Sequence, residues 1–292
     1  MLLSSVPPMA TDDTRMLRIL QITDTHISPT KPHFASNWAP VAALARAIAP
    51  DLVVHTGDVT VDGADMVEDL AHCRWLMDGL ELPWAAVPGN HDVGSENPDH
   101  IQAVNDLRIS RWEAHFGPDR WLRDAGPWRL IGLNAMLMGS GHPREAEQAD
   151  WAGEVLAEAE ATGRPVALFL HKPLFLNDPD EDDRGYWSVP GRARGPYVEA
   201  IRRGTVKLVA SGHLHTARIF RRDGTVFAFG ASSGFIVDKL APADIPGEKR
   251  LGATLHLLDE DGTVESRLLS PEGLDTYVID DVVHEVYPPQ GR

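Results

Sequence analysis

Short apolar runs of strand length alternate with helical patterns in the first third of the chain. The runs at 17–23, 52–55 and 83–87 predict strands, and the apolar spacing at 41–49 and 66–80 predicts helices between them. The strands recur about every 30 residues, which is the length of a β-strand, helix, β-strand unit. The pattern therefore predicts an α/β fold.

The same alternation continues more loosely in the middle of the chain. Strands are predicted at 128–134, 166–170 and 206–210, and helices at 145–161 and 196–203. The segment before them, 96–128, is rich in proline and tryptophan. It predicts one helix within an otherwise irregular segment that covers part of the fold.

Beyond residue 215 the pattern predicts only β-structure. The runs at 217–221 and 225–229 flank a turn at 222–224, and the runs at 251–258 and 263–269 flank another turn, so both pairs predict hairpins. We expect a mixed-sheet α/β protein with its helices outside. One domain is expected over 16–292, after a flexible N-terminal tail at 1–15.

The charge balance narrows the partners that the surface can attract. The 292 residues include 27 basic and 43 acidic side chains, a net charge of -16. Nucleic acid held by phosphate contacts, or an anionic membrane surface, would need clustered Lys and Arg. We therefore expect neither partner.

The sequence also favours a cytoplasmic protein. Cys73 is the single cysteine, so the fold does not depend on an intramolecular disulfide, and no apolar run is long enough to span a membrane. Residues 1–10 lack the basic start of a signal peptide. Oligomeric state stays open, including a homo-oligomer.

Polar side chains follow five of the predicted strands. In α/β sheets, ligands bind outside the carboxyl ends of the strands, so we expect these five ends to converge on one site. The candidate residues are Asp24, His26, Asp58, Asn90, His91, His171, His213 and His215.

These residue types fit a metal site. Carboxylate, amide oxygen and imidazole suit Zn, Mn and Fe, and no thiolate is present. Side chains two residues apart, such as His213 and His215, reach one centre only if the chain turns sharply. Gly212 would permit such a turn, and Gly57 would let Asp58 approach a cation.

The motifs that these residues form, in their order along the chain, resemble those of the calcineurin-like metallophosphoesterases. The resemblance implies a four-layer αββα sandwich, with two mixed sheets flanked by helices, and two metal ions that are Mn, Fe or Zn. Five motif blocks carry it: Asp24-x-His26, Gly57-Asp58, Gly89-Asn90-His91-Asp92, His171 and Gly212-His213-x-His215.

The resemblance also implies a role for each residue. One metal would be held by Asp24, His26, Asp58 and His215. The other would be held by Asp58, Asn90, His171 and His213, with Asp58 bridging the two. A bridging hydroxide would attack the phosphorus in line, and the catalytic residues would be His91, Asn90 and Asp58. His91 would be the general acid, and Asp92 is a candidate to orient it.

Subfamily signals point in two directions. The segment 171–176 and Tyr186 resemble the calcineurin-like phosphoesterase-domain-containing protein 1 group, which is linked to phosphoprotein dephosphorylation. The segments 24–26 and 89–92 resemble class III cyclic-nucleotide and glycerophospho-diesterases. Val61 stands where purple acid phosphatases carry tyrosine.

The leading hypothesis is hydrolysis of a small phosphodiester or phosphomonoester. A phosphoprotein phosphatase is the alternative. It is weakened because Asp62 and Gly63 stand where calcineurin-type phosphatases carry Asp-Arg-Gly. An inactive scaffold of the same fold is a third reading, although no expected ligand is missing. Substrate choice is expected to depend on 96–128 and on the acidic loop 177–187, where Tyr186 and Trp187 either wall a pocket or simply pack.

Overall fold

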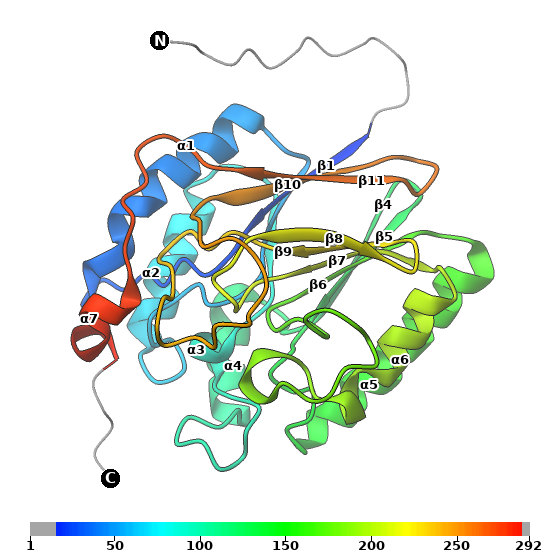
Figure 1. Cartoon of the computed structure of the whole chain (residues 1–292), viewed down its shortest axis with the longest axis horizontal. Helices are drawn as coiled ribbons and strands as arrows, with labels where there is room; N and C mark the ends of the chain where they lie inside the picture. The colour runs from blue at the N-terminus through cyan, green and yellow to red at the C-terminus, as the bar shows by residue number, and fades with distance from the viewer. Residues whose placement is uncertain (1–15, 288–292) are drawn as a thin grey trace.

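Two β-sheets pack against each other, and helices cover their outer faces (Figure 1). The computed structural model of the chain describes residues 16–287, so the tail predicted at 1–15 lies outside the described residues. The expected four-layer αββα sandwich of two mixed sheets is confirmed.

The first sheet has five strands in the order β11-β10-β1-β2-β3. They are β1 (Leu17–Ile22), β2 (Leu52–His55), β3 (Trp84–Ala86), β10 (Ala253–Leu258) and β11 (Val264–Leu269). β1, β2 and β3 run parallel, whereas β10 pairs antiparallel with β1. Helices α1 (Trp38–Ile48) and α2 (Val67–Asp78) belong to this half of the molecule.

The second sheet has six strands in the order β4-β5-β6-β7-β9-β8. They are β4 (Trp121–Ala125), β5 (Trp128–Leu133), β6 (Val166–Leu170), β7 (Val206–Ser211), β8 (Arg218–Arg222) and β9 (Thr225–Phe229). Helices α5 (Pro143–Thr162) and α6 (Gly191–Arg202) flank it (Figure 1).

Alternation along the strands divides the core into layers. In β6, Ala167 and Phe169 join a cluster with Ile19 of β1 between the sheets, whereas Leu168 and Leu170 join the cluster that contains the helices. Successive side chains of a strand point to opposite faces, so a strand buried on both sides reads as a continuous apolar run. This explains why the strands were predictable as short apolar runs.

Part of the segment predicted as irregular is a strand. Helix α4 (Asp106–Phe116) supplies the predicted helix, but β4 then pairs antiparallel with β5 at the edge of the second sheet. Trp121 lies opposite Gly132, and a Cβ at that glycine would come within 2.2 Å of the indole. The missing side chain at Gly132 therefore makes room for Trp121 and lets this strand pair.

The prediction of β-structure alone after residue 215 was wrong. Both hairpins are present, but the chain then forms helix α7 (Ile279–Val286). Ile279, Val282, Val283 and Val286 recur at helical spacing and join a cluster with Phe34. Helix α6 also begins at Gly191, earlier than the predicted start at 196.

Three short helical segments complete the described chain. They are η1 (Pro32–Asn37), α3 (Asn90–Val93) and η2 (Gly185–Trp187). Within residues 16–287, no helix combines the length and apolar character needed to cross a bilayer.

Candidate metal centre

The ends of five strands meet where the two sheets come together. β1, β2 and β3 contribute from the first sheet, and β6 and β7 from the second. Hydrogen bonds between the loops hold them together: Asp24 N donates to Gly57 O (3.0 Å), and Gly212 N donates to His171 O (2.8 Å). The side chain of Gln21 crosses between the sheets, because Nε2 donates to Ser211 O (3.0 Å).

The backbone at the centre is strained. Five of the seven predicted metal ligands adopt positive φ, a conformation that costs a non-glycine residue about 1 kcal/mol or more and concentrates at functional sites. These are Asp24 (52°), His26 (44°), Asp58 (51°), His213 (72°) and His215 (51°). The turns that bring alternate residues to one centre are therefore made by the candidate ligands themselves.

Gly212 has a different role from the predicted one. Its own φ is not positive, so it does not provide the turn. Instead, a Cβ at this position would lie 2.0 Å from Thr23 Oγ1 and 2.6 Å from Asp24 Oδ2. Gly212 is needed because the two sheets approach too closely there for any side chain.

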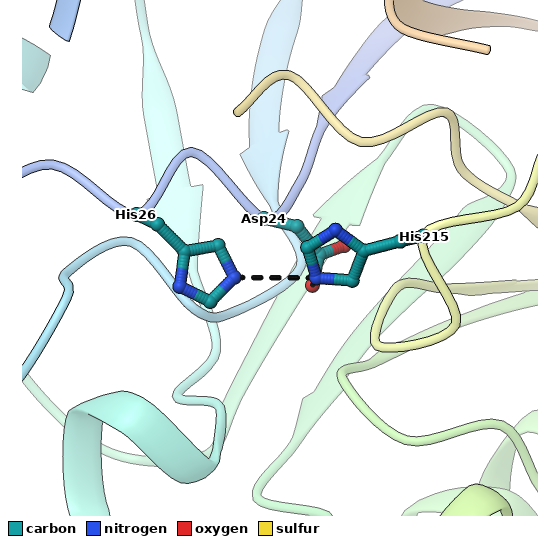
Figure 2. A group of neighbouring side chains, drawn as sticks. All are labelled: Asp24, His26 and His215. Atoms are coloured by element: carbon teal, nitrogen blue, oxygen red, sulfur yellow. Dashed lines mark hydrogen bonds and ion pairs between the residues drawn. The ribbon is translucent and has the colours of Figure 1, made fainter. Parts of the chain in front are cut away.

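Asp24, His26 and His215 form one buried cluster (Figure 2). The Nε2 atoms of the two histidines point toward each other and lie 3.3 Å apart, and His215 Nε2 lies 3.5 Å from Asp24 Oδ1. The main-chain amide of His213 and the hydroxyl of Thr23 donate to the Asp24 carboxylate, which holds it in place.

Asp58, His171 and His213 form a second buried cluster. His171 Nε2 lies 3.2 Å from Asp58 Oδ2 and 3.2 Å from His213 Nδ1. Asp58 Oδ2 is also 3.7 Å from His26 Nε2, so the same carboxylate oxygen faces both clusters. This is the position that a bridging ligand would need.

The free ring nitrogens fit metal ligands. His171 Nδ1 donates to Thr56 O (2.8 Å), and His215 Nδ1 donates to Phe235 O (2.7 Å), because a carbonyl can only accept. When the rings are neutral, this leaves Nε2 with its lone pair toward the cluster, the arrangement typical of metal-binding histidines.

His213 and Asn90, which are also candidate ligands of the second metal, each have an atom available to bind it. His213 is turned the other way, with Nε2 donating to Tyr186 O (2.8 Å) and Nδ1 toward the cluster. Asn90 Oδ1 is buried and has no hydrogen-bond partner among the described residues. The donor set of oxygen and imidazole nitrogen suits Mn, Fe or Zn.

Burial and mutual charge shift the pKa values of these groups. Burial lowers the pKa of His26 and His213 well below the usual range, which keeps their rings neutral. Burial also disfavours the charged form of His171, but the carboxylate of Asp58 outweighs it and raises the pKa to about 9. The surrounding imidazoles hold the pKa of Asp58 well below its usual range despite burial. The Asp58 carboxylate thus makes the site attractive to positive charge.

His91 lies at the mouth of the centre. Like Asn90 and unlike the other candidate ligands it is partly exposed, and with Asn90 it lines a cavity of about 460 Å³. Its Nδ1 donates to Val61 O (3.0 Å), and within residues 16–287 Nε2 has no hydrogen-bond partner. A partly exposed imidazole in this place can reach a bound substrate.

The suggestion that Asp92 orients His91 is not supported by the hydrogen bonds. The Asp92 carboxylate accepts from Thr60 N (3.0 Å), Thr60 Oγ1 (2.7 Å) and Gly89 N (2.9 Å). Asp92 therefore ties the loop after β2 to the loop after β3, and Val61 O orients the His91 ring.

Two tyrosines reach the centre. The ring of Tyr186 lies 4.5 Å from that of His213, and both Tyr186 and Tyr287 line the cavity beside His91. For Tyr186, the pocket-wall interpretation is the one that the structure supports. Tyr287 was not predicted, because its only local signal is the apolar spacing of the helix before it.

Comparisons with known proteins agree on one family. Residues 17–217 match the family described as calcineurin-like phosphoesterase. A probable cyclic nucleotide phosphodiesterase of Psychrobacter arcticus is 24% identical over 76% of this chain and 82% of its own length. The 3′,5′-cyclic adenosine monophosphate phosphodiesterase CpdA of Escherichia coli is 31% identical over 54% of this chain and 56% of its own.

A third relative carries a different activity in its name. The serine/threonine-protein phosphatase CPPED1 of Danio rerio is 30% identical over 46% of this chain and 42% of its own length. This chain therefore spans about half of two of the three relatives.

Solved structures show the same fold at low sequence identity. A purple acid phosphatase from yellow lupin has a TM-score of 0.61 at 12% identity, over 92% of this chain and 56% of its own. A dimetal phosphatase from Danio rerio has a TM-score of 0.55 at 12% identity, over 87% of this chain and 99% of its own.

Proposed function

The chain belongs to the calcineurin-like phosphoesterase family and is a metal-dependent phosphoester hydrolase, and from this premise we propose that it hydrolyses a small phosphodiester. The observation that carries the proposal is the pair of buried clusters, with Asp58 Oδ2 lying 3.2 Å from His171 Nε2 in one and 3.7 Å from His26 Nε2 in the other. Two cations close together repel each other, and a shared carboxylate offsets that repulsion.

The proposed ligands divide between two cations. The first would be held by Asp24, His26, Asp58 and His215, and the second by Asp58, Asn90, His171 and His213. When bound, the two cations supply Lewis acidity toward phosphoryl oxygens and lower the pKa of water beside them. Mn, Fe and Zn all suit this donor set.

The protein's own contribution is to position these ligands and to supply a proton. Main-chain groups fix the rings of His171, His213 and His215, so their lone pairs are aimed before any cation arrives. His91 is the proposed general acid, because with Nδ1–H bound to Val61 O its imidazolium form would carry the second proton on Nε2, in a ring that lines the cavity. A proton passed from His91 to the leaving oxygen would neutralise that oxygen as the ester bond breaks.

The cavity supports a small substrate. It holds about 460 Å³, and its wall includes Tyr186, Tyr287 and residues 100–102 of the covering segment. That volume lies in the range of small-molecule pockets. Lys31, Gln102 and Asp62 add polar groups that could recognise the non-phosphate part of a diester.

A phosphoprotein phosphatase is the second candidate. The similarity to the CPPED1 phosphatase favours it. Against it, a phosphorylated peptide would have to enter a cavity walled by two tyrosines and by residues 100–102. We therefore rank a small diester first.

A turnover panel tests the proposal. Protein freed of metal is reloaded separately with Mn²⁺, Fe²⁺ or Zn²⁺ and given a cyclic nucleotide, a glycerophosphodiester, a phosphomonoester and a phosphoserine peptide. We expect kcat/KM to be highest for a diester and to vanish in Asp58→Ala. Turnover of the phosphopeptide without turnover of either diester would replace this proposal with the second candidate.

A further inference from the structure

Tyr287 reaches the candidate metal centre from outside the part of the chain that matches the family. The matched residues end at 217, whereas Tyr287 follows α7 near the C-terminus. Its hydroxyl oxygen lies 2.8 Å from His26 Nδ1, and its ring centroid lies 4.6 Å from that of His91. One side chain thus contacts a proposed metal ligand and the proposed general acid.

His26 is held differently from the other histidines of the site. The rings of His91, His171, His213 and His215 each bond a main-chain carbonyl. Among the described residues, the partner of His26 Nδ1 is instead the Tyr287 side chain. A main-chain carbonyl is present whichever residue stands at a position. A hydroxyl group is present here only because residue 287 is tyrosine.

We propose that Tyr287 is a positioning residue that fixes the His26 ring for the first cation. The hydroxyl holds the ring in place, and when Nε2 binds the cation the phenolic oxygen would accept the hydrogen bond from Nδ1–H. Nε2 is the atom that faces His215 Nε2 (3.3 Å) and Asp58 Oδ2 (3.7 Å). The hydroxyl therefore holds the orientation of the His26 ring, as main-chain carbonyls hold the orientation of the other rings.

Helix α7 is anchored firmly enough to hold Tyr287 in this place. Lys31 Nζ donates to Val286 O (2.8 Å), and Val286 is buried against Phe34. At the other end of the helix, Ile279 N donates to Ile236 O (3.0 Å). Figure 1 shows α7 beside the first half of the chain, on the side of the molecule that holds α1 and α2.

Phe235 links this anchoring to the neighbouring ligand. Its ring lies 4.6 Å from that of His26 and 4.2 Å from that of His215, and its carbonyl accepts from His215 Nδ1. Phe235 also belongs to the same apolar cluster as Val286. The C-terminal helix and the first cluster are therefore packed as one unit.

This inference rests on the proposed function, because it requires His26 to be a ligand, so the experiment measures cation binding and not only activity. Metal-free wild type, His26→Ala, Tyr287→Phe and Tyr277→Phe are titrated with Mn²⁺ by calorimetry and by the EPR signal of free Mn²⁺. Tyr277→Phe is the matched control: it removes a hydroxyl just before α7 that bonds the exposed side chains of Ser36 (2.8 Å) and Asp275 (3.3 Å), neither of which is a candidate ligand.

We expect wild type to bind two Mn²⁺ and His26→Ala to lose affinity at one site. Tyr287→Phe should weaken that same site about tenfold or more, in the range found for groups that orient metal ligands. Tyr277→Phe should bind like wild type. Excess Mn²⁺ should restore much of the kcat of Tyr287→Phe, because the ring and its contact with His91 remain.

Two results would overturn the inference and leave the proposed function standing. One is that Tyr287→Phe binds Mn²⁺ with wild-type affinity at both sites. The other is that both sites are weakened equally and the Tm falls, which would show a general loosening of the fold. A wild-type protein that binds no Mn²⁺, Fe²⁺ or Zn²⁺ would overturn the proposed function and the inference together. The outcomes are therefore distinguishable.

Discussion

The main-chain amide of His91 donates a hydrogen bond to Asp58 Oδ1 (2.9 Å). This bond leaves the other oxygen of Asp58 to face His171 and His26. The proposed general acid therefore holds the proposed bridging ligand through its backbone, while its side chain lines the substrate cavity. Position 91 serves two purposes that mutation can separate.

The substitution His91→Ala should separate the role of the main chain at residue 91 from that of its side chain. The substitution keeps the main-chain amide, so we expect both cations to bind with wild-type affinity. It removes the proton donor, so kcat should fall by about 10²- to 10⁴-fold. Steady-state kinetics and metal analysis on one preparation check this, with Asp58→Ala as the variant that loses the cations. Wild-type kcat in His91→Ala would refute the assignment.

Gly212→Ala should damage the centre through crowding. The added Cβ would meet Thr23 Oγ1 at 2.0 Å and the Asp24 carboxylate at 2.6 Å, neither of which can move freely. We expect about 1–3 kcal/mol lower free energy of unfolding and weaker cation binding.

Gly153→Ala is the matched control for that substitution. It lies within α5, and apart from its chain neighbours and the backbone of its own helix no described atom lies within 4 Å of the added Cβ. Alanine is favoured over glycine in a helix, so this variant should be about 0.5–1 kcal/mol more stable. Denaturant unfolding compares both variants with wild type, and equal stability of the two would contradict the crowding argument.

Glu96→Gln should destabilise the protein and loosen the covering segment. Lys172, which follows the proposed ligand His171, is 1% exposed and pairs with Glu96. Removing the carboxylate leaves a buried ammonium without its counter-charge, so we expect a loss of about 3 kcal/mol in the free energy of unfolding.

A surface pair provides the comparison for Glu96. Glu265 pairs with Arg267 on β11, where both side chains are more than half exposed. Because exposed pairs contribute little, Glu265→Gln should unfold like wild type. If Glu96→Gln also matched wild type, the buried pair would not stabilise the fold.

His256 should make the fold less stable in acid. Burial lowers the pKa of this imidazole from 6.5 to about 3. Between these values the unfolded chain binds a proton that the folded chain does not, so stability is lost as pH falls below 6.5. Between pH 6.5 and 4.5 this difference in proton binding corresponds to about 2 kcal/mol.

The variant His256→Gln isolates that effect. Glutamine does not titrate, so the decline in unfolding free energy between pH 6.5 and 4.5 should be smaller by about that amount than in wild type. Urea unfolding at a series of pH values measures it. Identical slopes in the two proteins would show that His256 does not titrate on unfolding.

The positions of most strands and helices along the chain could be predicted because their signals are local. Val166–Leu170 is a continuous apolar run, and the structure has a strand with those bounds. β4 and α7 were missed because each depends on a distant partner: Trp121 needs Gly132, and the α7 cluster needs Phe34. The acidic composition near the C-terminus also hid the helical spacing of α7.

The candidate ligands were predictable as residue types at strand ends, in an order typical of one family. That information is local, because a polar residue after a strand is visible in the sequence alone. The structure brings Asp24, His26 and His215 together, and Asp58 with His171 and His213. Their assignment as metal ligands stays a proposal until cation binding is measured.

Other features are decided only by the folded chain. The positive φ of Asp24 and His215 is seen only in the folded chain, where their loops meet at the centre. Tyr287 and His26 are 261 residues apart, and their contact depends on the anchoring of α7. The sequence thus carries the reaction chemistry, since that depends on residue types. Tertiary structure determines the orientation of the histidine rings and the walls of the cavity beside His91, because both arise from contacts between distant segments.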